Sequence, residues 1–96
     1  MLKGYWIAHI EVSGLEEYKK YVEANSAAYA KFGGRCLARG GRYEILEGNG
    51  RSRNVIWEFP SFEAAVACYN SAEYQAAREY RKSAAVGDFV VVEGLE

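Results

Sequence analysis

Residues 3–12 have the pattern of a β-strand that is apolar on both faces: Lys-Gly-Tyr-Trp-Ile-Ala-His-Ile-Glu-Val. Successive side chains of a strand point to opposite faces, so Tyr5, Ile7 and His9 share one face. Trp6 lies on the opposite face. A strand with one solvated face would alternate apolar and polar residues instead. The stretch is therefore expected to be a central strand of a sheet, and it holds the only histidine of the chain.

A long amphipathic helix is predicted to follow this strand. Ser13 and Glu16 have the spacing of a capping box, and Gly33-Gly34 is a typical helix end, so the helix should run from Leu15 to about Phe32. The residues that recur at helical spacing are Leu15, Tyr18, Tyr21, Val22, Asn25, Ala28, Tyr29 and Phe32. We interpret Asn25 as a hydrogen-bonded polar group at the contact between helix and sheet, in preference to a ligand-binding residue.

The second half of the chain repeats the alternation of strands and helices. A second strand is predicted at 35–39, with a bulge at Gly40-Gly41 before it resumes at 42–46. A turn at 48–52 and a third strand at 53–59 would complete an antiparallel hairpin. Ser61 should cap a helix over 62–69, Asn70-Ser71 should break and recap it, and a further helix over 72–84 should lead to a last strand at 89–93.

The order strand, helix, strand, strand, helix, strand is that of the ferredoxin-like βαββαβ unit. This α+β fold has a four-stranded antiparallel sheet, with the first and third strands central and the helices on one face. A chain of 96 residues is long enough for one core, and no linker or low-complexity segment divides it. We therefore expect a single domain over residues 1–96.

The predicted sheet is apolar on the face away from the helices as well. In the third strand Ile56 opposes Val55, and in the last strand Val90 opposes Val91. An uncovered apolar face of this size indicates a partner or a ligand. We expect the partner to be a second copy of the chain, so that two sheets face each other as a dimeric α+β barrel with room for a small ligand.

Composition excludes several other classes of protein. The formal charge of −1 offers no field to attract nucleic acid or an anionic membrane, and we expect neither as a partner. No membrane span or secretory signal is evident, so a cytoplasmic location is expected. Cys36 and Cys68 form no CxxC pair and should be thiols. No metal site is expected, because one histidine and two distant cysteines lack ligand spacing, and no cofactor motif was found.

Several phrases resemble a bacterial domain-of-unknown-function family of the dimeric α+β barrel superfamily. The phrases are GYWIAH at 4–9, YVEAN at 21–25, RGG at 39–41, VIWEFPS at 55–61, YNS at 69–71 and EYQ at 73–75. The resemblance spans nearly the whole chain. It implies a ferredoxin-like dimer and brings no established reaction. Relatives in the superfamily include cofactor-free monooxygenases, lactone isomerases and haem-degrading enzymes, but their catalytic residues have no counterparts here residue by residue.

His9 is the candidate catalytic residue, because its face of the strand would look into the enclosed pocket. Strand direction predicts that His9 lies near Asn54 and Asp88, while Glu58 lies near Tyr5, too far away for a direct dyad with His9.

The candidate substrate-binding residues are Tyr5, Arg39, Asn54 and Glu58. We expect Arg39 to oppose the end of the third strand and to pair with Glu58. This arginine would either hold a substrate carboxylate or form a structural or dimer-bridging ion pair.

Two functions are consistent with these residues. In one, the dimer binds a small aromatic or carboxylate-bearing metabolite and acts as a cofactor-independent enzyme of the proton-transfer or monooxygenase type, with His9 moving a proton. In the other, His9 is a hydrogen-bonded structural residue and the protein is a non-catalytic structural or regulatory dimer.

Overall fold

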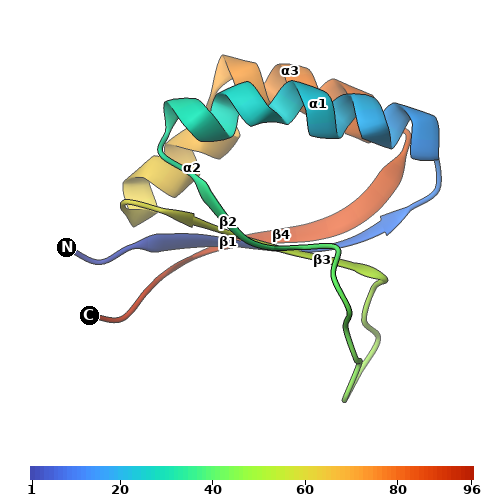
Figure 1. The fold of residues 1–96 in the computed structure, drawn as a ribbon, viewed down its shortest axis with the longest axis horizontal. Coiled ribbons are helices and arrows are strands. Elements are labelled where there is room, and N and C mark those ends of the chain that lie inside the picture. Colours follow the sequence, from blue (N-terminus) through green and yellow to red (C-terminus); the bar gives the residue numbers. More distant parts are fainter.

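A computed structural model describes residues 1–96 as a four-stranded antiparallel sheet with three helices on one face (Figure 1). The elements are β1 Gly4–Val12, α1 Leu15–Lys31, β2 Arg35–Arg39, β3 Arg53–Phe59, α2 Phe62–Asn70, α3 Ala72–Arg81 and β4 Ala85–Glu93. The predicted ferredoxin-like α+β fold is confirmed. None of the three helices is long and apolar enough to cross a membrane.

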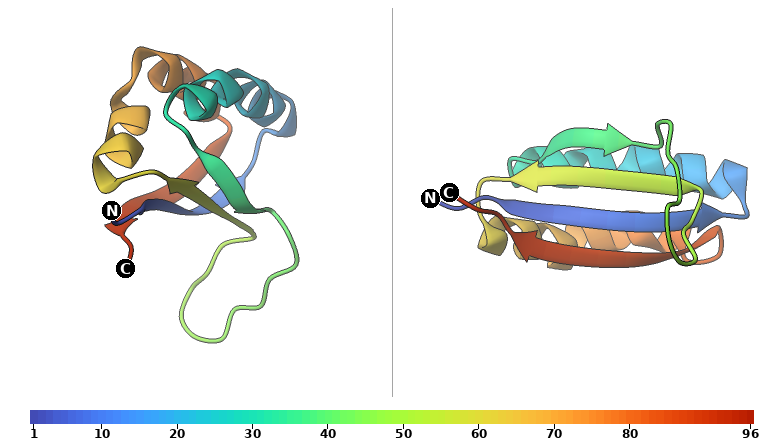
Figure 2. Two further views of the ribbon diagram at one scale, coloured as in Figure 1. Left: turned by 60° about the vertical axis from the view of Figure 1, so that its left-hand side comes forward. Right: turned by 90° about the horizontal axis from the view of Figure 1, so that it is seen from below.

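The strands lie in the order β2-β3-β1-β4, which makes β1 and β3 central, as predicted (Figure 2). β1 is antiparallel to both neighbours. His9 lies opposite Asn54 of β3 and opposite Asp88 of β4, while Tyr5 lies opposite Glu58. This register places the two ends of β1 in separate polar surroundings.

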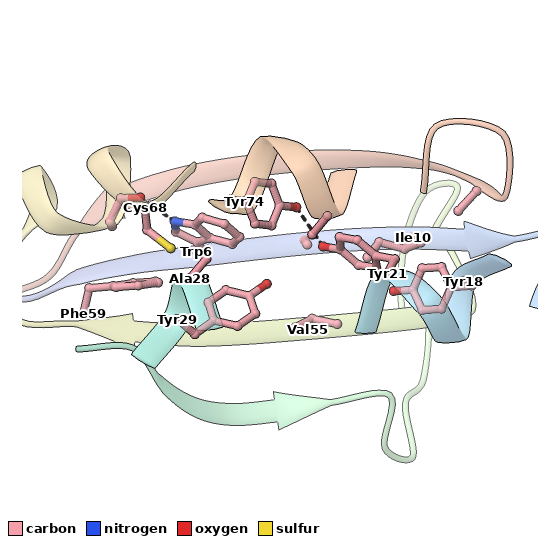
Figure 3. Packing of buried hydrophobic residues seen from close by; sticks show 14 of the residues in the cluster. Trp6, Ile10, Tyr18, Tyr21, Ala28, Tyr29, Val55, Phe59, Cys68 and Tyr74 are labelled. Carbon is pink, nitrogen blue, oxygen red and sulfur yellow. Dashed lines mark hydrogen bonds between the residues drawn. The ribbon is translucent and has the colours of Figure 1, made fainter. Parts of the chain in front are cut away.

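The core lies between the sheet and the helices and is centred on Trp6. Its ring lies next to five other aromatic rings, and its Nε1 donates to the Ala65 carbonyl oxygen at 2.7 Å. Figure 3 shows three of these rings, those of Tyr29, Phe59 and Tyr74, around Trp6. The hydroxyls of Tyr21 and Tyr74 lie 2.7 Å apart and join α1 to α3. The buried aromatic rings supply both apolar area and edge-on packing, so β1 is anchored firmly beneath the helices.

Two of the three predicted helix caps are confirmed. Ser61 Oγ accepts from the Ala64 amide at 3.0 Å, and Ser71 Oγ accepts from the Tyr74 amide at 3.1 Å. The capping box at Ser13 is wrong: α1 has no side-chain cap, and Ser13 Oγ donates to the Ala84 carbonyl oxygen at 3.2 Å. The Ser13 amide also donates to this oxygen, which draws the residue toward β4 and away from the helix amides.

The long helix α1 differs from its predicted stripe at its first position. Leu15 is 62% exposed and does not join the core, while the buried residues of the helix are Tyr18, Tyr21, Asn25, Ala28 and Tyr29. The helix ends at Lys31, and Gly33 follows with a φ of 75°, a left-handed conformation that glycine adopts without a steric penalty.

The connection between β2 and β3 is longer than predicted. The strand does not resume at 42–46, so residues 40–52 form an irregular loop. The irregularity in pairing falls between Cys36 and Ala38, where register shifts, and Gly40 turns the chain away with a φ of 67°. At the other end of the sheet, β4 begins at Ala85 and not at Phe89, because residues 85–88 pair with the end of β1.

Candidate functional site

The sheet face opposite the helices has an apolar centre with polar clusters at its two ends. Ile7, Ile56, Val90 and Val92 lie on this face by strand register, and Val90 and Val92 remain 55% and 43% exposed. We call this surface the open face. No segment of the chain covers its centre (Figure 1).

His9 lies at one end of the open face and is held by Asn54. The distance from His9 Nδ1 to Asn54 Oδ1 is 2.6 Å, and Asn54 Nδ2 donates to the Arg51 carbonyl oxygen at 3.3 Å. The second bond fixes the amide so that its oxygen faces the imidazole. The Asn54 oxygen can only accept a hydrogen bond, so Nδ1 of neutral His9 must carry the ring proton. Nε2 then has a free lone pair and can accept a proton from a ligand. His9 is thus a base whose orientation is set by Asn54.

The loop 40–52 stands out from the open face (Figures 1 and 2). Several of its residues line one hollow together with His9. It is fixed at its base by two contacts: Arg51 Nη2 lies 3.2 Å from Asp88 Oδ2, and Ser52 Oγ donates to Glu11 at 2.6 Å. The hydrogen bonds from Ser52 hold the pKa of Glu11 below its usual value. An open hollow of about 440 Å³ lies between loop and sheet, lined by His9, Tyr43, Glu44, Ile45, Leu46, Glu47, Gly50, Arg51 and Asn54.

Glu58 organises the opposite end of the open face. It accepts from the Tyr5 hydroxyl at 3.1 Å and from Lys3 Nζ at 3.3 Å, and Arg35 Nη1 lies 3.8 Å away. Desolvation raises the pKa of Glu58, but the hydrogen bonds from Tyr5 and Lys3 and the nearby positive charges outweigh it, so this pKa lies below 4.5. The same hydrogen bond raises the pKa of Tyr5.

The predicted Arg39–Glu58 pair is wrong. Because β2 and β3 are antiparallel, the first residue of β2 opposes the end of β3: Arg35 pairs with Glu58, and Arg39 lies opposite Val55. Paired residues share a face, so Arg39 lies on the helix side of the sheet with Val55. The other four candidates, His9, Tyr5, Asn54 and Glu58, share the open face, with His9 and Asn54 in contact and Tyr5 and Glu58 in a separate cluster.

Arg39 instead lines a second hollow, between α1 and the sheet. Asn25 and Arg53 line it too, and both were missed as site residues. Asn25 is 7% exposed and lies at the contact between helix and sheet, as predicted; none of the side-chain hydrogen bonds within the protein involves it, and its amide atoms are not among the fully buried atoms without a partner. A polar residue within an otherwise apolar stripe was the sequence signal for this hollow.

Nowhere in the structure do three or more His, Cys, Asp or Glu side chains lie close enough together to hold a metal ion. Cys36 and Cys68 are free thiols, and Cys68 is fully buried. Burial raises the pKa of the Cys68 thiol to about 12, so it is not a nucleophile near neutral pH.

Solved structures define the class to which this fold belongs. A protein of unknown function from Rhodopseudomonas palustris superposes with a TM-score of 0.80 at 18% identity, over 99% of this chain and 84% of that chain. SnoaB from Streptomyces nogalater, described as a cofactor-independent oxygenase, gives 0.71 at 10% identity, over 100% and 96%. A Thermobifida fusca protein described as dimeric and ferredoxin-like gives 0.62 at 14% identity, over 99% and 92%. These likenesses show a shared ferredoxin-like fold.

Within that class, the chain belongs to the family described as domain of unknown function DUF1330, whose model matches residues 3–95. The resemblance drawn from the sequence phrases is confirmed at the level of the family. Comparison with curated proteins gives no match. The role of each site residue therefore depends on the geometry of the chain itself.

Proposed function

We propose that this protein is a homodimer that encloses a small-molecule site on the open face, in which His9 accepts a proton from a bound aromatic or carboxylate-bearing metabolite. Each protomer contributes one dimeric α+β barrel domain over residues 1–96. The observation that carries the proposal is the pairing of an exposed apolar face with an oriented base at its end.

Apolar exposure supports the dimer. Val90 and Val92, at neighbouring positions of one strand face, are 55% and 43% exposed, and Ile7 and Ile56 continue the surface on β1 and β3; Val86, beyond Asp88 on the same face, is 61% exposed. Such a contiguous patch is costly in water and is relieved by a second copy related by a two-fold axis. Proteins of this fold that are described as dimeric, such as the one from Thermobifida fusca, support the same arrangement.

The proposed chemistry is a single proton transfer. Nε2 of His9 takes the proton of an acidic hydroxyl or C–H group, which leaves the metabolite as an anion and His9 as an imidazolium stabilised by Asn54. Arg51 lies at the same end of the face; Asp88 holds its Nε and Nη2, and its Nη1 group is the donor left for that anion. An aromatic anion is electron-rich, so the same step prepares a substrate for cofactor-independent oxygenation, the activity in the description of SnoaB.

The dimer is tested by light scattering during gel filtration, where a mass of twice 10.7 kDa is expected. A monomer at micromolar concentration would overturn the proposal. The ligand site is tested with 6-hydroxy-2-naphthoate, which carries a carboxylate and a titratable hydroxyl. The only histidine gives a single ring Cε1–H signal in NMR spectra, and this signal should shift saturably with the probe.

The base role needs a separate measurement on the same probe. Bound to the wild type, the probe should show the absorbance of its naphtholate anion, whereas His9→Ala should bind it in the neutral form. Equal naphtholate fractions in the two proteins would reject proton transfer to His9. Binding without any reaction would favour the alternative, a non-catalytic structural or regulatory dimer.

The proposal includes a reducing cytoplasmic setting, which the two free cysteines support.

A further inference from the structure

A second, smaller cavity lies inside each protomer, on the helix side of the sheet. It measures about 20 Å³, enough for a group the size of a water molecule or a carboxylate oxygen. Its walls are mostly aromatic and aliphatic side chains of α1, β1 and β3, and its polar lining includes Asn25, Arg39 and Arg53. His9 is not part of it, because His9 lies on the opposite face of the sheet.

The polar groups of this cavity have unused hydrogen-bonding capacity. Asn25 is only 7% exposed, none of the side-chain hydrogen bonds within the protein involves it, and its amide atoms are not among the fully buried atoms without a partner, so they retain accessible surface at the cavity that Asn25 lines. Arg53 donates from Nε to the Tyr18 hydroxyl at 3.0 Å, which positions the guanidinium and leaves its terminal nitrogens available. Arg39 is exposed at the edge strand β2 and makes no ion pair.

The local charge is also unbalanced. None of the residues that line the cavity is acidic, so Arg39 and Arg53 bring two positive charges to an aromatic-walled site with no internal counter-ion. The Arg53 guanidinium lies over the Tyr18 ring at 5.2 Å. Gly40 permits this placement: a Cβ at that position would lie 2.6 Å from Arg53 Nη1. The Arg53 guanidinium therefore lies directly against the backbone next to Arg39.

We propose that this cavity binds the carboxylate group of a small organic acid, with Asn25 donating from its amide and Arg39 and Arg53 supplying the charge. A carboxylate is planar and accepts from several donors at once, which matches guanidinium forks and a primary amide. With room for about one oxygen atom, the cavity of about 20 Å³ takes one carboxylate oxygen, while the second oxygen lies toward the exposed Arg39. The site is separate from the pocket proposed around His9 and exists once in every protomer.

The test is an NMR titration of the full chain with sodium acetate against sodium chloride at equal ionic strength. The expected result is a saturable shift of the Asn25 side-chain amide and the Arg53 Nε–H signals, with the His9 ring signal unchanged. A shift confined to His9, or no saturation at Asn25, would overturn the proposal. Inorganic phosphate binding more tightly than acetate would overturn the assignment to a carboxylate.

Variants separate this site from a general effect of charge. Arg39→Gln is expected to weaken acetate binding about ten-fold or more, the loss typical of one hydrogen bond to a charged group. Arg42→Gln removes the same charge from an exposed residue that does not line the cavity, and should leave affinity within about two-fold. Equal losses in the two variants would overturn the proposal. Arg39 is exposed, so its variant should fold normally, and circular dichroism verifies this.

Discussion

The orientation of the His9 imidazole depends on one amide oxygen. Asn54 Oδ1 accepts from Nδ1 at 2.6 Å, so neutral His9 should be the Nδ1–H tautomer. Asn54→Leu removes the acceptor and should lower the ratio of Nδ1–H to Nε2–H about five-fold, the equivalent of one hydrogen bond of about 1 kcal/mol. Long-range ¹⁵N–¹H correlation of the ring nitrogens, recorded on the neutral imidazole in alkaline buffer, measures this ratio directly.

The matched control is Asn54→Asp, which keeps an oxygen acceptor at the same place and should retain the Nδ1–H tautomer. A wild-type protein with the proton on Nε2 would contradict the proposed base, because its free nitrogen would then face Asn54. Since the chain has one histidine, no other ring contributes to the spectrum.

Strand parity was sufficient to predict which residues surround His9. The alternation of β1 and its antiparallel direction put His9 beside Asn54 and Asp88, and Tyr5 beside Glu58, without knowledge of any side-chain contact. The same reasoning failed for Arg39. The prediction placed the last residue of β2 opposite Glu58, whereas the first residue, Arg35, occupies that position. Residue pairing in a hairpin depends on where the loop begins. Because Gly40-Gly41 was predicted to be a bulge within a continuing strand, the predicted loop began too late in the chain and the pairing of β2 with β3 was shifted.

At the scale of elements, the starts of α2 and α3 depend on serine caps, while α1 does not. Ser61→Ala and Ser71→Ala should each lower the free energy of unfolding by about 1 kcal/mol, because each leaves a helix amide without its acceptor. The loss should be larger at Ser71, whose hydroxyl also donates to the Cys68 carbonyl oxygen at 2.7 Å. Urea unfolding followed by circular dichroism measures both changes.

Ser13→Ala is the comparison that separates the observed structure from the predicted capping box. Its hydroxyl bonds to Ala84 and caps no amide of α1, so the loss should stay within about 0.5 kcal/mol. Ser26→Ala, on the exposed side of α1, serves as a control with a similarly small effect. A loss at Ser13 equal to that at Ser61 would show that the serine caps α1 after all.

Periodic segments were predicted more accurately than connections. The bounds of β3 match the prediction, and α2 ends one residue later than expected, because apolar periodicity and cap residues act locally. The loop 40–52 and the early start of β4 depend on contacts made across the sheet. Ile10 and Val12 of β1 need partners, and Gly87 and Ala85 supply them even though glycine is a poor strand former.

At the scale of the whole molecule, two carboxylates on the open face make stability dependent on pH. The folded-state pKa values of Glu11 and Glu58 are lowered from 4.5, so the ionised carboxylates stabilise the fold above about pH 4.5. This contribution is lost as pH falls through the lowered values. Urea midpoints measured at pH 7, 5, 4 and 3 should therefore decrease most steeply below about pH 4.5.

Glu58→Gln should flatten part of that decrease, since glutamine has no proton to gain. Glu23→Gln removes an exposed carboxylate of α1 that forms no ion pair and should leave the pH profile unchanged. Parallel profiles for the wild type and Glu58→Gln would contradict the assignment of acid sensitivity to this cluster.

The apolar centre of the open face is the dimer interface that we propose. Val90→Lys places a charge at a position that is 55% exposed in the protomer but buried in the proposed dimer, and the two-fold axis brings two such charges to one interface. Burying unpaired charge costs several kcal/mol, so the dimer should weaken by about two orders of magnitude or more.

Leu15→Lys makes the same kind of change at a position that is 62% exposed on the helix side, and should leave assembly intact. Sedimentation velocity over a range of concentrations distinguishes the two variants. A dimeric Val90→Lys protein, or a monomeric Leu15→Lys protein, would show that the interface lies elsewhere and that His9 faces solvent.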